Sequence, residues 1–485
     1  MFKDATLLEV EDAMHRSCNA FKLFKKTSLA TRAALMRTIA KELEALGDHV
    51  IELAMRETHL PEGRLKNERA RTMHQLVSYA NACERGDWLN VSMCSASPDR
   101  VPPRPDIRKT MTPLGPVVVF GSSNFPFAYS TAGGDTACAL AAGCTVVLKA
   151  HPAHPETSEC VAQAIAKALE IHHLPKDVFI HIHGASFSVG EALVKNQHTK
   201  AVGFTGSYSG GMALFNWAQQ RKEPIPVFAE MGSVNPVYLF NEKLSADAVT
   251  VAQQYADSIT LGVGQFCTNP GILIGIDSPA LHRFIEELAS RMNAIPEGKM
   301  LHDGIAKAYE QRSSRAMTQK GVKVMTDPGR KPSAKSCSAL LLSVTASSFL
   351  ENSILHEEVF GPCSLLVICN DASEMKRVAE SLEGQLTSTV IATEDELKQH
   401  QELLSIIQCK CGRIIFNGVP TGVEVCQAMQ HGGPFPATTD SRFTSVGPDG
   451  IRRFARPISY QNFPDELLPD ELKSANPLGI NRTLE

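Results

Sequence analysis

From Gly115 onward, short runs of β-branched residues alternate with segments of helical character. The first set of apolar runs lies at residues 117–120, 145–148, 178–183 and 201–204. Strand, helix and strand at this spacing predict a parallel sheet with right-handed crossover connections. After about Met231 the alternation restarts, with further predicted strands at residues 236–240, 271–276, 339–344, 387–392 and 413–416. The chain is therefore predicted to belong to the α/β class, with two doubly wound parallel sheets.

The ends of the chain have a different character. The first hundred residues are predicted to be helical, because apolar residues recur at intervals of three and four and share one helical face: Leu35, Ile39, Leu43, Leu46, Val50 and Leu53. Four prolines between residues 97 and 105 interrupt this pattern and predict an extended excursion. The tail at 464–485 lacks periodicity, so we expect it to wrap a surface or a partner subunit. Residues 320–335 are expected to form a surface loop.

The charges and the hydropathy pattern exclude two classes of partner. The chain carries 48 basic and 52 acidic residues, a formal net charge of -4, so no basic surface for nucleic acid or anionic membrane is predicted. No apolar run approaches the roughly 18 to 20 residues that span a bilayer, and residues 1–14 carry acids in place of a basic leader region. We therefore expect a cytoplasmic protein without nucleic-acid or membrane partners.

The 13 cysteines are scattered without a repeating spacing, which is typical of reduced thiols rather than of a disulfide framework. Cys409 and Cys411 are the only close pair, and no second pair of cysteine or histidine residues follows at ligand spacing. No metal site is therefore predicted.

Two residues have the character of a nucleophile and a base. Cys267 lies in the segment GQFCTNP, between a helical stretch and an apolar strand, although a free cysteine alone is more often a core residue. Glu230 follows another apolar run and precedes Met-Gly. Partial burial there is expected to raise the pKa of its carboxyl group and to suit it to act as a general base on water. A helix cap or a surface acid is the alternative interpretation.

Three further segments suggest an oxyanion donor and a cofactor site. Asn124 follows the first predicted strand in FGSSNFP, where its amide can stabilise an oxyanion or simply form a turn. Lys149 leaves the end of a buried strand, where it can reach a ribose or phosphate or lie in solvent. The segment GFTGS at 203–207 joins a strand to a helix whose first N–H groups can bind a diphosphate. It lacks the GxGxxG fingerprint, so a plain turn is the alternative.

In their order along the chain, these segments resemble the aldehyde dehydrogenase superfamily, over nearly the whole sequence. The motifs are Asn124 in SNFP, Lys149, FTGS at 204–207, Glu230 in E-x-G, Gln265-Phe266-Cys267, EEVFGP at 357–362 and FNG at 416–418. The resemblance implies two α/β domains and a small β oligomerisation element. The cofactor-binding domain would comprise residues 1–100 and 113–231 and the catalytic domain 232–448, with 101–112 and 449–485 as the oligomerisation segment and C-terminal tail.

The resemblance also implies a mechanism. The Cys267 thiolate would attack an aldehyde, while Asn124 and the Cys267 backbone N–H hold the oxyanion. After hydride transfer to the nicotinamide, a water activated by Glu230 would hydrolyse the thioester. His431 would lie near the thiol and either assist proton transfer or pack beside Gly432-Gly433.

The implied cofactor is NAD or NADP. Lys149 would contact the adenosine ribose, Gly206 and Ser207 the diphosphate, and Glu358 the nicotinamide ribose, with Phe360 near the nicotinamide. Pro152 stands where relatives that prefer NAD often carry an acid, which leans the prediction slightly toward NADP. The arginine of NADP-specific relatives has no counterpart in residues 185–187, so both cofactors stay open.

Three segments resemble the branch that holds 2,5-dioxovalerate (2-oxoglutarate semialdehyde) dehydrogenases and NADP-dependent fatty aldehyde dehydrogenases: GGDT at 133–136, KAHPAHP at 149–155 and HGGPFPA at 431–437. The expected substrate is 2,5-dioxovalerate, with Arg452 and Arg453 as candidates to bind its carboxylate. The alternatives are a medium- or long-chain aldehyde dehydrogenase, a CoA-acylating enzyme, which Glu230 argues against, and a non-enzymatic relative, which the presence of Cys267, Asn124 and Glu230 argues against.

The resemblance further implies a homodimer, joined through an extended segment at about 101–112 and a strand at about 456–463. The chain begins close to its first predicted helix and lacks the leading strands common in relatives, which affects part of the expected subunit contact.

Overall fold

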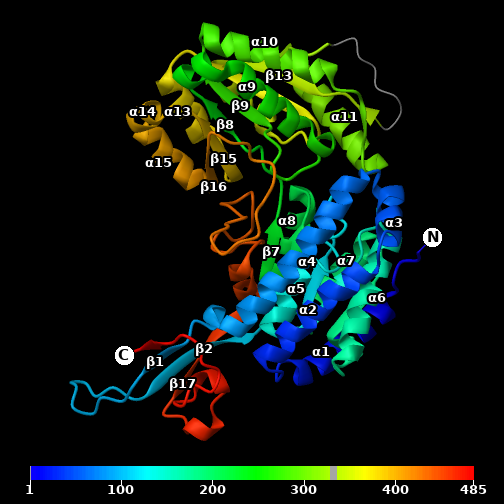
Figure 1. The fold of residues 1–485 in the computed structure, drawn as a ribbon, viewed down its shortest axis with the longest axis vertical. Helices are drawn as coiled ribbons and strands as arrows, with labels where there is room; N and C mark the ends of the chain where they lie inside the picture. The colour runs from blue at the N-terminus through cyan, green and yellow to red at the C-terminus, as the bar shows by residue number, and fades with distance from the viewer. Residues whose placement is uncertain (1, 328–335) are drawn as a thin grey trace.

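The computed structural model describes residues 2–327 and 336–485, which form two α/β units and a projecting β element (Figure 1). The first unit is built on a five-stranded sheet in the order β5-β4-β3-β6-β7, in which every neighbouring pair is parallel. Its strands are β3 (Val117–Phe120), β4 (Val146–Lys149), β5 (Phe179–Ile182), β6 (Ala201–Thr205) and β7 (Val227–Glu230).

Helices cover both faces of this sheet because its strands are apolar on both sides. In β3, Val117 and Val119 pack into one core, with α2, α4, α5 and α6, whereas Val118 and Phe120 pack into another, with α1, α7 and α8. These helices are α1 (Leu7–Phe24), α2 (Leu29–Ala45), α4 (Glu62–Arg85), α5 (Gly134–Ala142), α6 (Pro155–Ile171), α7 (Phe187–Lys195) and α8 (Tyr208–Gln219).

The apolar face predicted from Leu35 to Leu53 belongs to two helices rather than one. Helix α2 ends at Ala45, and α3 (His49–Thr58) begins after a short turn. Gly47 adopts a left-handed conformation there, with φ of +61°, which a continuous helix cannot contain. The interval of three and four residues persists across the turn because both helices bury their apolar sides in the same core.

The second unit is built on a seven-stranded sheet in the order β11-β13-β14-β9-β8-β15-β16. All neighbouring pairs are parallel except β11 with β13. The strands are β8 (Val237–Leu239), β9 (Ile272–Ile276), β11 (Lys323–Val324), β13 (Leu340–Thr345), β14 (Cys363–Cys369), β15 (Gln385–Ile391) and β16 (Cys411–Phe416). Strand β14 was absent from the predicted strands, although it pairs with β9 and β13 in the middle of the sheet.

Helices also flank this second sheet, together with a short two-stranded sheet of β10 (Gly298–Lys299) and β12 (Ser336–Cys337). The helices are α9 (Asn241–Thr260), α10 (Pro279–Ala294), α11 (Asp303–Met317), α12 (Ala346–Leu350), α13 (Ala372–Ser381), α14 (Glu394–Gln399) and α15 (Gln401–Lys410). With both parallel sheets present, the predicted fold class is confirmed.

A four-stranded sheet in the order β17-β2-β1-β18 projects from the body (Figure 1). Its strands are β1 (Ser92–Cys94), β2 (Ile107–Pro113), β17 (Ala455–Gln461) and β18 (Thr483–Leu484). The prolines at 97–105 lie in the connection between β1 and β2, as the predicted excursion requires. The tail predicted to wrap a surface returns to this sheet, where β18 pairs with β1.

Short 3-10 helices complete the described chain: η1 (Asp87–Leu89), η2 (Lys176–Val178), η3 (Leu261–Gly264), η4 (Ser353–His356), η5 (Pro448–Phe454), η6 (Asp465–Leu467) and η7 (Asp470–Leu472). Residues 328–335 of the predicted surface loop lie outside the described residues, and β11 occupies part of its first half. Within the described ranges, no helix combines the length and the apolar character needed to cross a membrane.

Candidate active site

The carboxyl ends of the five parallel strands bring several predicted site residues to one edge of the sheet. Phe120 at the end of β3 is in register with Lys149 on β4, and Thr205 on β6 with Glu230 on β7. From β3 the chain adds β4 and β5 on one side of the sheet, and it then returns to add β6 and β7 on the other side. Such a switch point is where open α/β sheets bind ligands.

Cys267 comes to this edge from the second unit. The backbone of η3 adopts left-handed conformations at Gly262, Val263 and Gly264, with φ of +54°, +59° and +64°, and these turn the chain out of α9 toward the first unit. Such a conformation is costly for a branched residue such as Val263, so the surrounding structure must impose it.

Asn235 holds the nucleophile loop in place, a role that the sequence analysis missed. Its Nδ2 donates to the backbone oxygens of Cys267 and Asn269, both at 2.9 Å. The side chain is fully buried, and its Oδ1 accepts from Thr387 Oγ1 at 2.9 Å. An asparagine before a proline gives no sequence signal for such a distant contact.

The predicted nucleophile, base and histidine meet in one triangle. His431 Nε2 lies 3.7 Å from Cys267 Sγ and 3.0 Å from Glu230 Oε1. Because the same ring nitrogen faces both groups, the imidazole can exchange one proton with either of them. It cannot relay a proton between them through its two nitrogens.

Ser445 fixes the carboxylate of Glu230 and was also missed by the sequence analysis. Its Oγ lies 2.6 Å from Glu230 Oε2, to which it donates, and 3.1 Å from the backbone oxygen of His431. The backbone N–H of Ser445 donates to the same His431 oxygen at 2.8 Å. The two sides of the triangle are therefore joined by one serine from the segment before η5.

The charges of the triangle differ from those expected from the sequence. Burial opposes the ionisation of Glu230, but the charge and hydrogen bond of His431, with help from Ser445, lower the pKa of this carboxyl group below its usual value. The expectation of a raised pKa was therefore wrong. Burial and the negative charge of Glu230 raise the pKa of the Cys267 thiol well above its usual value. The site thus pairs a carboxylate with a protonated thiol.

The predicted oxyanion donor, Asn124, is buried beside the nucleophile loop. Its Nδ2 donates to the backbone oxygen of Gln265, two residues before Cys267, at 3.2 Å. Arg64 on α4 donates to the Asn124 backbone oxygen at 2.7 Å and stacks on the Phe266 ring, with its guanidinium carbon 4.5 Å from the ring centre. Asn124 is thus held against the loop that carries Cys267.

Two arginines act on the nucleophile electrostatically. The charge of Arg71 on α4 acts to lower the pKa of Cys267, and the charge of Arg413 on β16 also interacts with the thiol. Arg413 donates through its two terminal nitrogens to backbone oxygens of the 420–422 loop, while its buried Nε has no hydrogen-bond partner among the described residues.

The two arginines considered from the sequence have other surroundings. Arg453 lines a cavity beside Glu230 and His431, but its guanidinium is already paired with Asp135 at 2.6 Å. Arg452 is half-exposed, 3.9 Å from Asp449.

The cofactor residues predicted from the sequence lie around the same sheet edge. Burial lowers the pKa of Lys149 to about 8, and its Nζ donates to the Gly184 backbone oxygen at 2.6 Å. Ser207 caps helix α8, accepting from the Gly210 N–H at 3.2 Å, so the first turn of the helix follows the Gly206 turn. This geometry fits a diphosphate at the helix N-terminus.

Glu358 approaches the catalytic loop from the other side. Burial raises the pKa of its carboxyl group to about 7, and a Cβ on Gly232 would lie 2.4 Å from its Oε2. The absence of a side chain at Gly232 therefore gives Glu358 its space beside the residues that follow Glu230. Phe360 follows two residues later in the same segment and is half-buried.

Asp4 adds a carboxylate to the same region, which the sequence analysis did not consider. Its two oxygens accept from the backbone N–H groups of Ala185 and Ser186, at 2.7 Å and 2.9 Å. A hydrogen bond from the Ser186 side chain, together with these two backbone hydrogen bonds, lowers the pKa of Asp4, and the charge of Asp4 acts on Lys149. The N-terminal segment therefore brings an acid into the surroundings of Lys149.

Comparisons with known proteins relate the whole chain to one family. A family model described as "Aldehyde dehydrogenase family" matches residues 1–434. Alpha-ketoglutaric semialdehyde dehydrogenase 2 of Azospirillum brasilense is 47% identical over 483 residues, covering 99% of this chain and 92% of the relative. The alpha-ketoglutaric semialdehyde dehydrogenase of Acinetobacter baylyi is 46% identical over 484 residues, with coverage of 99% and 92%. A crystal structure of glyceraldehyde-3-phosphate dehydrogenase from Methanocaldococcus jannaschii complexed with NADP has a TM-score of 0.80 at 18% identity, over 95% of each chain.

Proposed function

Because the chain belongs to the aldehyde dehydrogenase family and is thus an oxidoreductase that acts on aldehydes, we propose that it oxidises 2-oxoglutarate semialdehyde (2,5-dioxovalerate) to 2-oxoglutarate through a thioester on Cys267. The observation that carries this proposal is the position of His431 Nε2, 3.7 Å from the Cys267 thiol and 3.0 Å from the Glu230 carboxylate. The names of the two relatives at 47% and 46% identity support the choice of aldehyde.

In the first half-reaction, the Cys267 sulfur attacks the aldehyde carbon as a thiolate. The raised pKa of the thiol means that its proton must leave at this step, and it can pass to the Glu230 carboxylate or to the neutral form of the His431 imidazole, which are both in reach. The amide of Asn124 turns from the Gln265 oxygen to the new oxyanion. The family uses NAD or NADP, and the bound nicotinamide supplies the hydride acceptor.

In the second half-reaction, water attacks the thioester carbon and the carbon–sulfur bond breaks. Glu230 takes a proton from that water, which its ionised state allows, because its lowered pKa keeps it a carboxylate near neutral pH. Ser445 holds the other carboxylate oxygen, so the base keeps its orientation. Hydrolysis forms the carboxylic acid product and regenerates the free Cys267 thiol.

The carboxylate of the proposed substrate needs a cation near the thiol. Arg71 and Arg413 both interact electrostatically with Cys267. Their hydrogen bonds in the described chain go to backbone oxygens and to the Tyr129 hydroxyl, not to a carboxylate. A guanidinium binds a carboxylate through two parallel hydrogen bonds. We therefore assign recognition of the substrate carboxylate to these two arginines, rather than to Arg453, which is paired with Asp135.

Arg413→Gln and Arg71→Gln are expected to lower kcat/KM for 2-oxoglutarate semialdehyde by about 10²-fold each, because a charged hydrogen bond contributes roughly 1.5–3 kcal/mol. The kcat/KM for pentanal, which has the same five-carbon length without a carboxylate, should change little. Steady-state kinetics of both aldehydes with each purified variant measure this specificity ratio.

Arg452→Gln is the matched control, because Arg452 is half-exposed beside Asp449. Equal losses for both aldehydes in the Arg71 and Arg413 variants, or a selective loss in the Arg452 variant alone, would contradict this assignment. The same assays also include decanal. If decanal has the highest kcat/KM in the parent enzyme, it is a fatty aldehyde dehydrogenase and the proposed substrate is wrong.

For the cofactor, the position of Asp4 supports NAD over NADP, in contrast to the slight lean toward NADP from position 152. The Asp4 carboxylate already takes the N–H groups of Ala185 and Ser186 and acts on Lys149, the proposed ribose ligand. A 2′-phosphate at that ribose would meet a fixed negative charge, and the two N–H groups at the start of α7 would not be free to bind it.

Asp4→Asn should raise the ratio of kcat/KM for NADP to that for NAD by about tenfold, the equivalent of ~1.4 kcal/mol, because one charge repulsion is removed. Asp12→Asn is the control, since Asp12 is an exposed acid on α1 whose partner is Arg16. An unchanged cofactor ratio in Asp4→Asn would mean that Asp4 does not contribute to selection.

We also propose a quaternary structure and a cellular location for the protein. Strand β17 is mostly exposed and pairs only with β2 in the described chain, which supports a homodimer joined through this edge of the projecting sheet. A monomer in sedimentation velocity would contradict it. We also propose the domain division with boundaries at residues 101–112, 231 and 448, and a cytoplasmic location, both of which are predictions from the sequence.

A further inference from the structure

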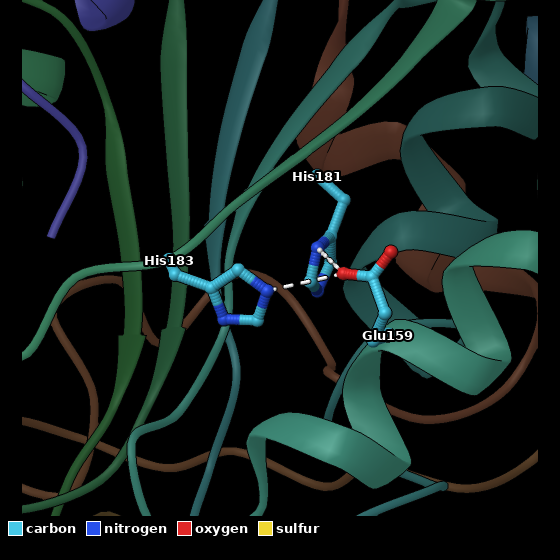
Figure 2. A group of neighbouring side chains, drawn as sticks. All are labelled: Glu159, His181 and His183. Carbon is cyan, nitrogen blue, oxygen red and sulfur yellow. Dashed lines mark hydrogen bonds and ion pairs between the residues drawn. The ribbon is translucent and has the colours of Figure 1, made fainter. Parts of the chain in front are cut away.

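Glu159, His181 and His183 form a second cluster of titratable side chains, separate from the catalytic triangle (Figure 2). His181 on β5 and His183 just after it alternate along extended chain, so both rings lie on one face of the sheet. Glu159 reaches them from helix α6. Its Oε2 lies 3.2 Å from His181 Nδ1 and 3.1 Å from His183 Nε2.

These distances match the spacing of ligands around a small metal ion. Zinc binds imidazole nitrogen and carboxylate oxygen at about 2.0–2.2 Å, so neighbouring ligands in a tetrahedral site lie about 3.3 Å apart. One ligand atom from each of the three residues lies within 4.8 Å of the others. The two rings are nearly perpendicular, at 82°, so their lone pairs converge on the carboxylate without the rings overlapping.

The surroundings of His181 resemble the support that metal-binding histidines receive. Its second nitrogen, Nε2, lies 2.8 Å from Ser158 Oγ, which in turn lies 2.6 Å from Thr131 Oγ1. Ser158 and Thr131 are both buried. Such a hydrogen bond on the far nitrogen fixes the ring orientation and leaves Nδ1 directed at the carboxylate.

The exposure of the cluster also suits a bound cation. The Glu159 side chain is 41% exposed, against 8% and 18% for His181 and His183, which leaves an open side toward solvent. Phe2 stacks on the His183 ring, with centroids 4.2 Å apart.

We infer that Glu159, His181 and His183 bind a divalent transition-metal ion, with Zn²⁺ as the best match, and that solvent completes its coordination. The sequence analysis predicted no metal site, because it considered only the cysteine pair at 409 and 411. The signal that was missed is the pair of histidines two residues apart, His181 and His183, at the end of a predicted strand.

Calorimetric titration of Zn²⁺ into the full chain tests this site. The titration uses the Cys267→Ala protein, because Glu230, Cys267 and His431 also offer three ligand atoms to a metal. We expect one equivalent of Zn²⁺ with micromolar or tighter affinity. His183→Gln and Glu159→Gln should each weaken this binding by at least about 10²-fold.

Two control variants match these changes at exposed positions: Glu170→Gln on the same helix α6 and His74→Gln on α4. Both should retain the site, and circular dichroism of all variants verifies that they fold. Titration with Co²⁺ adds a spectroscopic check, because a site of nitrogen and oxygen ligands gives d–d bands without thiolate charge transfer. No saturable binding, equal binding in the His183 and Glu159 variants, or thiolate charge transfer from the bound Co²⁺ would overturn the inference.

Discussion

Replacement of Cys267 by alanine is expected to abolish dehydrogenase activity, with kcat/KM lowered by about 10⁴-fold or more. No other nucleophile stands in the catalytic triangle: Glu230 and His431 can accept protons, and Ser445 Oγ is engaged with Glu230 at 2.6 Å. NAD(P)H absorbance with 2-oxoglutarate semialdehyde measures the loss.

Two controls make this result specific to the thiol. Cys369→Ala removes a buried cysteine from β14 in the core of the second unit, and should change stability without abolishing turnover. The Cys267→Ala protein should still bind the cofactor, because the proposed cofactor residues lie on other segments. Quenching of protein fluorescence measures this binding. Substantial NAD(P)H production by folded Cys267→Ala protein would refute the role of Cys267 as nucleophile.

Glu230→Gln is expected to separate the two half-reactions. Attack and hydride transfer need the thiolate, whereas hydrolysis needs an activated water, so the variant should reduce one cofactor per active site and then stall. Stopped-flow absorbance should show a burst close to one equivalent of enzyme, followed by a steady rate depressed by about 10²-fold or more. A steady rate equal to that of the parent would exclude Glu230 as the general base.

The same substitution should make the resting thiol more reactive. Glu230 raises the pKa of Cys267 through its charge and hydrogen bond, so removal of this charge lowers the thiol pKa and increases the thiolate fraction at pH 7. Alkylation of the cofactor-free protein by iodoacetamide should therefore be faster in Glu230→Gln than in the parent. In the parent, the rate should keep rising above pH 9. A slower reaction in the variant would indicate that Glu230 acts mainly by deprotonating the thiol.

The Glu230 variant also distinguishes water from CoA as the acyl acceptor. If CoA restores full turnover to the stalled variant, the enzyme is an acylating dehydrogenase and hydrolysis is not its natural second step. The hydrolytic account predicts that CoA leaves the steady rate low. Ser445→Ala should show a milder form of the same defect, because it releases one oxygen of the Glu230 carboxylate without removing the base.

The sequence predicted those parts of the fold that have local signals. Most strands are short β-branched runs bounded by turns, and the alternation with helices sets the parallel topology. Strand β14 was missed even though it forms the same kind of buried apolar run as β3 and β15, which were predicted. The turn at Gly47 was not predicted, because the apolar periodicity continues from one helix to the next when both helices face the same core.

Some site residues were predictable because the carboxyl ends of parallel strands share an edge. Glu230 and Lys149 end such strands, and Asn124 follows one. Contacts between distant segments gave no such signal. Ser445 meets Glu230 across 215 residues of sequence, and Asp4 meets Ala185 across 181.

The direction of the pKa shift of Glu230 could not be predicted from the sequence for the same reason. Burial alone favours a raised pKa, and this was the effect visible from the strand end in the sequence. The opposing effect comes from His431 and Ser445, which reach Glu230 only through the folded chain. The sign of the shift therefore depends on tertiary contacts that a local reading of the sequence cannot supply.

The central claim is that 2-oxoglutarate semialdehyde becomes a thioester on Cys267 that Glu230 then helps to hydrolyse. The most direct test is acid quenching of Glu230→Gln during the burst with cofactor and this aldehyde, followed by peptide mass spectrometry. The account predicts that the peptide containing Cys267 carries the 2-oxoglutaryl group close to one per active site, and that the parent enzyme accumulates far less. An unmodified Cys267 after a full burst, or the acyl group on another residue, would contradict it.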